Sequence, residues 1–175
     1  APHRALANNS VSYTEKPDME TFLREWTALV ESKSGERGIF NRQASKKQAA
    51  KNGRRDTEWE FGTNPCSEII LRPYQFCNLS EVVVRATDDL KSLSNKVRLA
   101  TIIGTLQSSL TKFPYLRKVW QTNTEEERLL GVSLTGIMDN PLLTAKNKGL
   151  AQTLDHLRLV AVDTNKEWAE RLGVQ

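Results

Sequence analysis

The sequence predicts an α/β fold that is mostly helical and carries a few short strands. Apolar residues recur at helical spacing over 19–30, 97–110 and 150–168, which indicates three helices. Two short apolar runs, 69–71 and 82–84, are typical of buried strands. Because two or three strands can neither close a barrel nor form a complete doubly wound sheet, we expect the chain to be part of a larger α/β body.

The first helix is predicted from its capping residue and its apolar stripe. Asp18 is a suitable N-cap, and Gly35 and Gly38 are expected to end the helix. The aromatic pair Phe22 and Trp26 is expected to lie in the core. The stripe consists of Met19, Phe22, Leu23, Trp26, Leu29 and Val30.

The elements on either side of this helix are predicted from polar and turn-forming residues. Residues 1–16 are expected to form a loop or a short strand. A second, polar helix is predicted over 41–52, started by Asn41 and stopped near Gly53. The composition then changes over 57–86, where short strands are expected on both sides of a loop.

The C-terminal half is predicted to be helical. A helix over 96–113 has apolar residues around most of its circumference, so it is expected to be largely buried and to be stopped by Pro114. A helix over 124–138 begins with three glutamates, which favour a helix N-terminus. Its two glycines, Gly131 and Gly136, suit close helix packing, and a phosphate loop is less favoured because no lysine follows as in a P-loop. A long helix from Leu150 completes the chain.

Composition and charge bound the class of protein. Hydrophobic residues make up 38% and charged residues 26% of 175 residues, as in a soluble globular protein. No apolar run is long enough to cross a bilayer and no signal peptide is visible, so we expect a cytoplasmic protein that does not contact membrane. The first residue is Ala1 rather than methionine, which indicates a processed chain or a piece of a larger one.

Basic residues cluster in one stretch, although the net charge is only +4. One interpretation is a solvated helix face or a contact with another part of a larger protein. The other is a phosphate contact, on a nucleotide or a polynucleotide. No aromatic residue is interleaved with the charges, so single-stranded nucleic acid is not supported and no nucleic-acid partner is expected. The cluster consists of Arg42, Lys46, Lys47, Lys51, Arg54 and Arg55.

The segment around Cys66 carries the most distinctive chemistry. In an extended backbone Asn64, Cys66 and Glu68 would share one face, which places a thiol between an amide and a carboxylate. Flanking turn formers, Pro65 among them, predict a loop that carries these side chains into a cavity. The alternative is that Cys66 and Cys77, the only two cysteines, are small buried hydrophobes.

Other cysteine chemistries fit less well. The only histidines, His3 and His156, lie far from the cysteines in sequence, so neither a metal site nor a cysteine–histidine nucleophile is supported. No Cys-x-x-Cys motif is present, which argues against a thioredoxin-like centre. Glu68 can act as a general base on a hydroxyl, and Asn64 can donate to and accept from a neighbouring hydroxyl. Two adjacent hydroxyls are what a ribose offers.

The residues of this segment resemble a known family. The stretch 62–82 reads GTNPCSEIILRPYQFCNLSEV and is similar to the active-site finger loop of ribonucleotide reductases. The Asn-x-Cys-x-Glu core is shared by the oxygen-dependent and cobalamin-dependent classes. Pro65 and the spacing to Cys77 favour the adenosylcobalamin-dependent class, and 69–71 with 80–82 favour its monomeric triphosphate reductases. The stretches 35–42 and 127–136 also resemble this family.

The resemblance implies a function and a fold. Cys66 matches the cysteine that becomes a thiyl radical and takes the 3′ hydrogen, Glu68 the base on the 3′-hydroxyl, and Asn64 the amide that binds the ribose hydroxyls. Cys77 matches one of the two cysteines that reduce the substrate radical. The implied cofactor is adenosylcobalamin, the substrate a ribonucleoside triphosphate, and the reductant of thioredoxin type. The implied fold is part of a ten-stranded α/β barrel.

The chain also departs from the family. Cys77 needs a partner thiol, and no thiol is left for this role because the only other cysteine, Cys66, is already assigned. The C-terminal cysteine pair and the downstream phosphate-binding segment are absent, and family members are several times longer. We therefore expect residues 1–175 to be an incomplete segment of the catalytic barrel, with the finger loop at about 62–80, that acts with the remaining segments of the reductase. The alternatives are an inactive interaction piece or an oxygen-dependent reductase with a partner radical subunit.

Overall fold

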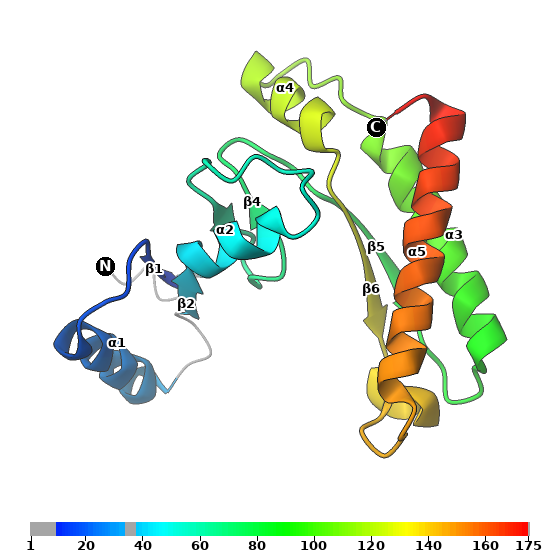
Figure 1. The fold of residues 1–175 in the computed structure, drawn as a ribbon, viewed down its shortest axis with the longest axis horizontal. Coiled ribbons are helices and arrows are strands. Elements are labelled where there is room, and N and C mark those ends of the chain that lie inside the picture. The colour runs from blue at the N-terminus through cyan, green and yellow to red at the C-terminus, as the bar shows by residue number, and fades with distance from the viewer. Residues whose placement is uncertain (1–9, 34–37, 175) are drawn as a thin grey trace. The chain divides into compact units, whose positions relative to one another are not determined.

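The computed structural model describes residues 10–33 and 38–174. The chain divides into two compact units, Ala1–Gln75 and Phe76–Gln175 (Figure 1). Helices and short strands are mixed in both units, as the sequence predicts for an α/β protein. Within the described residues no helix is long and apolar enough to cross a membrane.

The first unit contains a parallel strand pair and a small hairpin. Strand β1 (Ser10–Tyr13) pairs in parallel with β2 (Gly38–Asn41), and helix α1 (Met19–Ser32) lies between them in sequence. Helix α2 (Arg42–Ala50) follows β2 directly. Strands β3 (Gly62–Thr63) and β4 (Ile70–Leu71) form an antiparallel pair.

Both helices of this unit begin where their capping residues predict. Asp18 accepts hydrogen bonds from the Thr21 amide and hydroxyl, each 2.8 Å long. Asn41 accepts one from the Ala44 amide, 2.9 Å long. At the other end, α1 is closed by Lys33 in a left-handed conformation (φ 48°). Of the two glycines expected there, Gly35 lies outside the described residues and Gly38 opens β2 instead.

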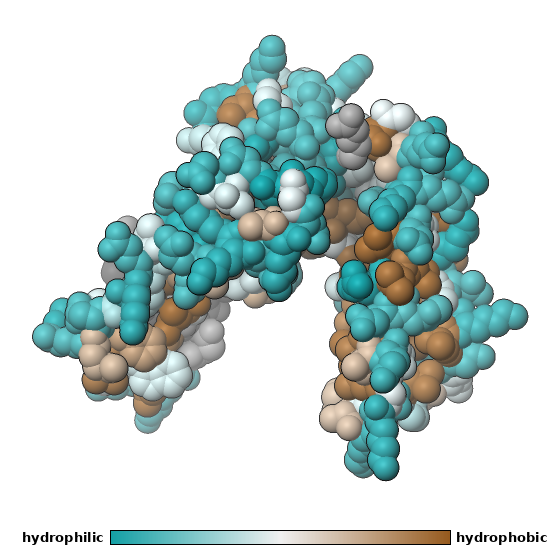
Figure 2. Space-filling model, viewed as in Figure 1, coloured by the Kyte–Doolittle hydropathy of each residue, from teal (hydrophilic) through white to brown (hydrophobic). Residues whose placement is uncertain are grey.

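The apolar stripe of α1 does not form a core in this unit. Phe22 and Trp26 stack with ring centroids 6.1 Å apart, but the helix buries no residue and Trp26 is 52% exposed. The prediction that this pair is core is therefore wrong for the chain by itself. The spacing identified the apolar face, but it did not identify what covers that face. Figure 2 shows brown, hydrophobic side chains at the surface of α1.

The second unit is a β–α–β arrangement with a long additional helix. Strand β5 (Asn78–Val83) pairs in parallel with β6 (Leu130–Thr135), in a register that runs from Asn78–Leu130 to Val83–Thr135. Helices α3 (Leu90–Ser108) and α4 (Lys118–Glu127) connect the two strands. Two short 3₁₀ helices, Ile137–Asp139 and Pro141–Leu143, precede α5 (Leu150–Leu172). The position of α5 confirms the predicted terminal helix.

The core of this unit lies between β5 and the helices α3 and α5. It is a single cluster of buried apolar side chains, joined by partly buried residues of β6 and α5. Alternate residues of β5 point into it, so the strand prediction at 82–84 is confirmed, although Val83 itself is 45% exposed. The buried members are Val82, Val84, Leu93, Val97, Ala100, Leu143 and Leu157.

The predicted helix over 124–138 is wrong, because its second half is β6. Leu130, Val132 and Leu134 alternate with small or polar residues, and Val132 and Leu134 pack on the core as period-two strand residues do. The two glycines do allow close backbone packing, but between the β5 and β6 segments and not between helices. Gly131 lies opposite Leu79 in the register, and a β-carbon at Gly136 (φ +74°) would lie 2.5 Å from the Val84 carbonyl oxygen.

The buried face of helix α3 carries both apolar and polar side chains. The helix starts at Leu90 with a capping box between Asp89 and Ser92, and it ends at Ser108, well before Pro114. Thr101 and Thr105 are buried, and their hydroxyls donate hydrogen bonds to the carbonyls of Val97 and Thr101, each 2.7 Å long. The prediction of a largely buried apolar helix is therefore wrong for the chain by itself. The exposed apolar residues are Leu99, Ile103 and Leu106.

This arrangement predicts different costs for truncating leucines on the two faces of α3. Leu93 is fully buried in the core, so Leu93→Ala is expected to lower the free energy of unfolding by about 2–5 kcal/mol. Leu99 is 60% exposed, and Leu99→Ala is expected to change it by less than about 0.5 kcal/mol. Urea unfolding followed by circular dichroism measures both. Equal losses would contradict the burial described.

Candidate functional site

The Asn64–Cys66–Glu68 segment forms the loop of the β3–β4 hairpin in the first unit. The pairs Gly62–Leu71 and Thr63–Ile70 close its base. The Asn64 side-chain oxygen accepts a hydrogen bond from the Ile69 amide at 3.0 Å, across the width of the loop. The Asn64 carbonyl accepts a second one from the Ser67 amide, also at 3.0 Å. The prediction of a loop between strand signals is therefore confirmed.

The backbone of this loop is not extended. Residues 65 and 66 form a turn, and Ser67 has a left-handed conformation with φ 65°. The expectation that alternate residues share one face is therefore wrong at this segment. The physical reason is that Asn64 hydrogen-bonds to nearby backbone, which favours a turn over a strand.

The chemical groups of the loop differ in their access to solvent. Cys66 and Glu68 are exposed, and Asn64 is half-buried. Neither Cys66 nor Cys77 forms a disulfide. With its oxygen bound to the Ile69 amide, Asn64 still has two side-chain N–H groups to donate. The loop thus presents a reduced thiol at its tip, with a carboxylate and an amide donor close in sequence.

The chain before the loop is held by basic residues from α2 and from the segment after it. The Phe61 ring is fully buried, and the Arg55 guanidinium lies 4.9 Å from its centroid. Arg42 donates to the Phe61 carbonyl at 2.8 Å and forms an ion pair with Glu60 at 3.2 Å. Lys46 lies 3.8 Å from the same carboxylate. Part of the basic cluster therefore supports the base of the loop.

The chain after the loop contains a buried arginine. Arg72 is 5% exposed, and its guanidinium lies 4.9 Å from the Trp59 ring centroid. The Arg72 amide donates to the Gln75 side-chain oxygen at 3.1 Å, and Gln75 is itself buried. The contact between Arg72 and Trp59 joins the end of the hairpin to the segment that precedes it. Arg72 was not predicted from the sequence, although an arginine flanked by an apolar residue and a proline, Leu71 and Pro73, is a signal of such a role.

Cys77 belongs to the second unit, where it lies directly before β5 and is half-buried. The first residue of that strand, Asn78, is anchored to the Leu129 carbonyl by its backbone amide at 2.9 Å and by its side-chain amide at 3.2 Å. Cys77 therefore lies at a fixed point, the start of a paired strand.

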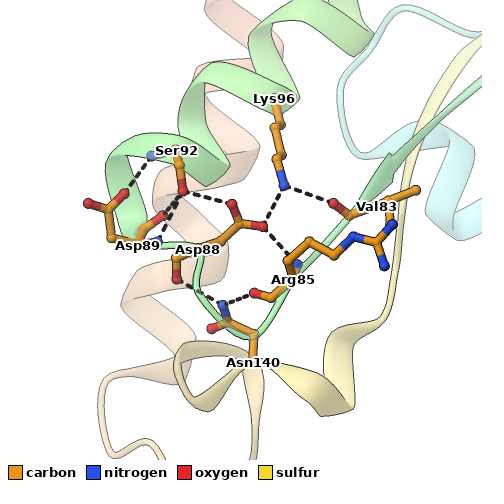
Figure 3. Close-up of polar contacts among 7 residues, drawn as sticks. All are labelled: Val83, Arg85, Asp88, Asp89, Ser92, Lys96 and Asn140. Carbon is orange, nitrogen blue, oxygen red and sulfur yellow. Dashed lines mark hydrogen bonds and ion pairs between the residues drawn. The ribbon is translucent and has the colours of Figure 1, made fainter.

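A network of charged side chains closes the other end of β5 (Figure 3). The Asp88 carboxylate, whose side chain is 8% exposed, forms an ion pair with Lys96 at 2.6 Å. It also accepts from the Arg85 amide at 2.7 Å and from the Ser92 hydroxyl at 2.9 Å. Lys96 in turn donates to the Val83 carbonyl at 3.0 Å. Sequence reasoning missed this network, which joins the strand end to the first turns of α3.

The amide of Asn140 continues the same network from the segment after β6. Its nitrogen donates to the carbonyls of Arg85 and Asp88 at 2.8 and 2.9 Å. Its oxygen accepts from the Leu142 amide at 2.8 Å, and the residue is fully buried. The loops after both parallel strands are thereby tied together. Every polar group of this side chain is used inside the fold, so the network is structural.

The Asp88 contacts predict a stability that depends on pH. The hydrogen bond from Lys96, followed by that from the Arg85 amide, lowers the pKa of Asp88 below its ordinary value of 3.8. The stabilisation is therefore complete above the ordinary pKa and is lost as the pH falls through the lower pKa of the folded state. Asp88→Asn is expected to lower the unfolding midpoint at pH 7, and its difference from the unmodified chain is expected to shrink below pH 3.8.

Thermal unfolding between pH 2 and pH 7 measures this effect. Asp155→Asn is the matched control, because the Asp155 side chain is 73% exposed and its ion pair with Arg158 is 3.6 Å long. A difference for Asp88→Asn that stays constant across the whole pH range would contradict the role given to its charge.

The structure also shows where His156 lies and whether metal-ligating side chains come together. His156 lies on α5, and its ring nitrogen is 3.0 Å from the Ser94 hydroxyl of α3, so it connects two helices. His3 lies outside the described residues. Among the residues with described positions, no three side chains of histidine, cysteine, aspartate or glutamate come together as metal ligands.

Comparison with known proteins gives two curated relatives of one name, "Adenosylcobalamin-dependent ribonucleoside-triphosphate reductase". The protein of that name from Lacticaseibacillus paracasei is 33% identical over 142 residues, which are 78% of this chain and 18% of the relative. The protein from Lactobacillus gasseri is 27% identical over 98% of this chain and 26% of the relative. The chain thus spans between about a fifth and a quarter of the length of these relatives. No protein-family model matches the chain, and no solved structure matches it.

Proposed function

We propose that this chain carries the active-site loop of an adenosylcobalamin-dependent ribonucleoside-triphosphate reductase. The observation that carries the proposal is the Cys66 thiol, reduced and exposed at the tip of a hairpin loop, with Asn64 and Glu68 close in sequence. The similarity to two reductases of this name supports the same assignment.

The proposed chemistry begins at Cys66. As a thiyl radical, its sulfur takes the hydrogen atom from C3′ of the ribose, which forms an S–H bond and leaves the unpaired electron on C3′. Glu68 removes the proton of the 3′-hydroxyl. The reducing thiol pair supplies two hydrogens, one that leaves with the 2′-hydroxyl as water and one that is added to C2′. Glu68 returns its proton to the 3′ oxygen, and the Cys66 S–H returns a hydrogen atom to C3′ at the end of the turnover. Cys66 therefore has to be accessible, as it is at the loop tip.

Asn64 would position the substrate in this scheme. Its oxygen is committed to the Ile69 amide at 3.0 Å, so the group left for the ribose hydroxyls is the side-chain NH₂, which can donate twice. The hydrogen bond to Ile69 also fixes the direction in which this NH₂ points. We therefore assign Asn64 two tasks, which are to shape the loop and to donate to the sugar.

Cys77 would supply one of the two electrons that the reduction consumes. It and a partner thiol reduce the substrate radical and end as a disulfide, which a thioredoxin-type reductant then resets by thiol exchange. Both cysteines of this chain are already assigned, so the partner thiol has to come from another segment. The start of β5 holds Cys77 in a half-buried position suited to a defined encounter.

Cys66 fits the role of the thiol that reacts with the cofactor-derived radical. Adenosylcobalamin supplies the initiating radical when bound. An exposed thiol on a supported loop can exchange a hydrogen atom with such a radical, and Cys66 meets that requirement. We assign no residue of this chain to the corrin ring.

The exposed apolar surface supports a place within a longer reductase chain. The stripe of α1 and the outer face of α3 leave Met19, Leu23, Leu99 and Ile103 between 50% and 70% exposed. In the described residues β5 pairs on one edge, with β6. A groove of about 530 Å³ lies beside β5 and α3. Its lining includes Leu79, Val83, Leu99 and Ile103. Such surfaces in a globular protein are usually covered. We propose that the rest of a catalytic barrel covers them.

A loop graft tests the proposal. Residues 62–80 of this chain replace the corresponding segment of the Lacticaseibacillus paracasei relative, and the graft enzyme is assayed for deoxyribonucleotide with ATP, adenosylcobalamin and a dithiol. Product formation well above that of a graft whose loop is replaced by a glycine–serine linker is expected. A graft enzyme that folds and binds nucleotide as its parent does, yet forms no product, would contradict the proposed function.

A further inference from the structure

Cys77 lies between two residues that are both held by the connection from β5 to β6. On one side is Phe76, whose ring packs against Trp120 of α4 and against Phe113 of the preceding loop. The Phe76–Trp120 centroids are 4.6 Å apart with planes at 29°, and the Phe76–Phe113 centroids are 5.1 Å apart with planes at 64°. Offset-stacked and edge-to-face pairs at these distances are favourable beyond the area that they bury.

On the other side of Cys77 is Asn78, which is held by a single carbonyl. Its backbone amide and its side-chain amide both donate to the Leu129 oxygen, at 2.9 and 3.2 Å. The first bond belongs to strand pairing, but the second exists only because residue 78 is an asparagine. Leu129 follows Arg128, the residue that closes α4, so both anchors of Cys77 come from the chain around that helix.

The anchoring chain is itself fixed in place. Arg128, in a left-handed conformation (φ 42°), ends α4 and donates through its guanidinium to the Ser108 carbonyl at 2.7 Å. The Glu125 carboxylate accepts from Gln121 at 2.8 Å and from Thr111 at 2.9 Å, which joins the loop before α4 to the helix. These contacts hold the ends of the connection where they meet Phe76 and Asn78.

We infer that Phe113, Trp120 and Leu129 position the Cys77 thiol by fixing its two sequence neighbours. They are positioning residues, since their described contacts are with Phe76 and Asn78. The arrangement distinguishes the two thiols of the chain, because Cys66 is exposed on a turn whereas Cys77 is half-buried at an anchored strand start. A reductant thiol that is held in one position reacts with its substrate and its partner thiol without first losing conformational freedom. This catalytic meaning rests on the proposed function, whereas the positioning itself does not.

The test is the reactivity of each thiol in the complete chain. The reduced chain is alkylated with iodoacetamide, and the peptides that contain Cys66 and Cys77 are quantified separately by mass spectrometry. Alkylation rates are recorded from pH 6 to pH 10, a range that brackets the pKa of an ordinary thiol. A change in the access of the reagent to the thiol raises the plateau of the rate at high pH. A change in the pKa of the thiol moves the midpoint of the curve instead. Cys66 is the internal control in every sample.

Trp120→Ala is expected to raise the plateau rate at Cys77 between about twofold and about tenfold, the range that corresponds to the worth of one aromatic pair. The rate at Cys66 is expected to stay the same, and Trp120→Phe is expected to restore most of the slow rate at Cys77. Asn78→Ala removes one hydrogen bond without changing ring packing, and it is expected to raise the Cys77 rate in the same direction. It provides a second measurement if Trp120→Ala fails to fold.

Leu93→Ala is the matched control, because it weakens the core of the same unit without touching Phe76 or Asn78. Positioning predicts that this variant leaves the Cys77 rate at its original value under conditions where the chain is folded. An unchanged Cys77 plateau in the folded Trp120→Ala and Asn78→Ala variants, or an equal rise in Leu93→Ala, would overturn the inference. These results do not depend on reductase activity, so they are distinguishable from a failure of the proposed function.

Discussion

Replacing Cys66 by serine in the loop-graft enzyme is expected to reduce deoxyribonucleotide formation to the background of the assay. A serine hydroxyl retains the shape and the hydrogen-bonding ability of the thiol, but its O–H bond is too strong for the oxygen to carry the radical. The Asn64–Ile69 hydrogen bond, which shapes the loop, does not involve the Cys66 side chain. The loss should therefore appear in turnover and not in the stability of the graft enzyme.

The measurement is the amount of deoxyribonucleotide per enzyme, with thermal unfolding recorded alongside. Ser67→Gly is the matched control, since Ser67 has φ 65°, a conformation that glycine adopts without strain. This variant is expected to keep the activity of the graft enzyme. Substantial product from Cys66→Ser, or an equal loss in Ser67→Gly, would contradict the role of the Cys66 sulfur.

Replacing Cys77 by serine in the same graft is expected to stop repeated turnover and to leave the first radical step intact. Cys77 would act after hydrogen abstraction, as a source of reducing equivalents that become a disulfide. Its loss removes the electrons but not the Cys66 thiol, nor the loop that presents it. The two variants should therefore differ in kind: Cys66→Ser stops the first step, and Cys77→Ser stops a later one.

The product formed per enzyme, followed from less than one to many turnovers with excess dithiol, measures this effect. Ser80→Ala, on β5 but not assigned to the chemistry, is the control for changes in the strand itself. Continued linear product formation by Cys77→Ser would show that another thiol supplies the electrons, and the assignment of Cys77 would then be wrong.

The parts of the fold that depend on local signals could be predicted from the sequence. Asp18 and Asn41 cap α1 and α2 as expected, because a capping side chain needs only the next three residues to form its hydrogen bond. The long helix α5 was predicted from its apolar spacing. These elements required no knowledge of their partners.

The failures have a common physical cause, which is that local sequence does not reveal the tertiary partners of an element. Three glutamates suggested one helix across 124–138, yet the chain turns at Arg128 and pairs β6 with β5, a strand about fifty residues earlier. The apolar spacing in α1 and α3 identified apolar faces correctly. Whether those faces are buried depends on what packs against them, and in this chain they are exposed.

At the candidate site, residue types could be predicted but directions could not. The pattern Asn64–Cys66–Glu68 located the loop, whereas the hydrogen bond from Ile69 to Asn64 made it a turn and removed the common face. The anchoring of Cys77 was missed because Phe76 and Trp120 are distant in sequence. The only local signal was an aromatic residue before the cysteine and an asparagine after it.

The most direct test of the account is isotope exchange at C3′ of the bound ribonucleotide. In the loop-graft enzyme with 3′-tritiated substrate and adenosylcobalamin, tritium is expected to leave C3′ when Cys66 is present, and to do so in the Cys77→Ser variant as well. In the Cys66→Ser variant the substrate is expected to keep all of its tritium. Release of tritium by that variant at the rate of the graft enzyme would contradict the claim that the sulfur of Cys66 takes the 3′ hydrogen.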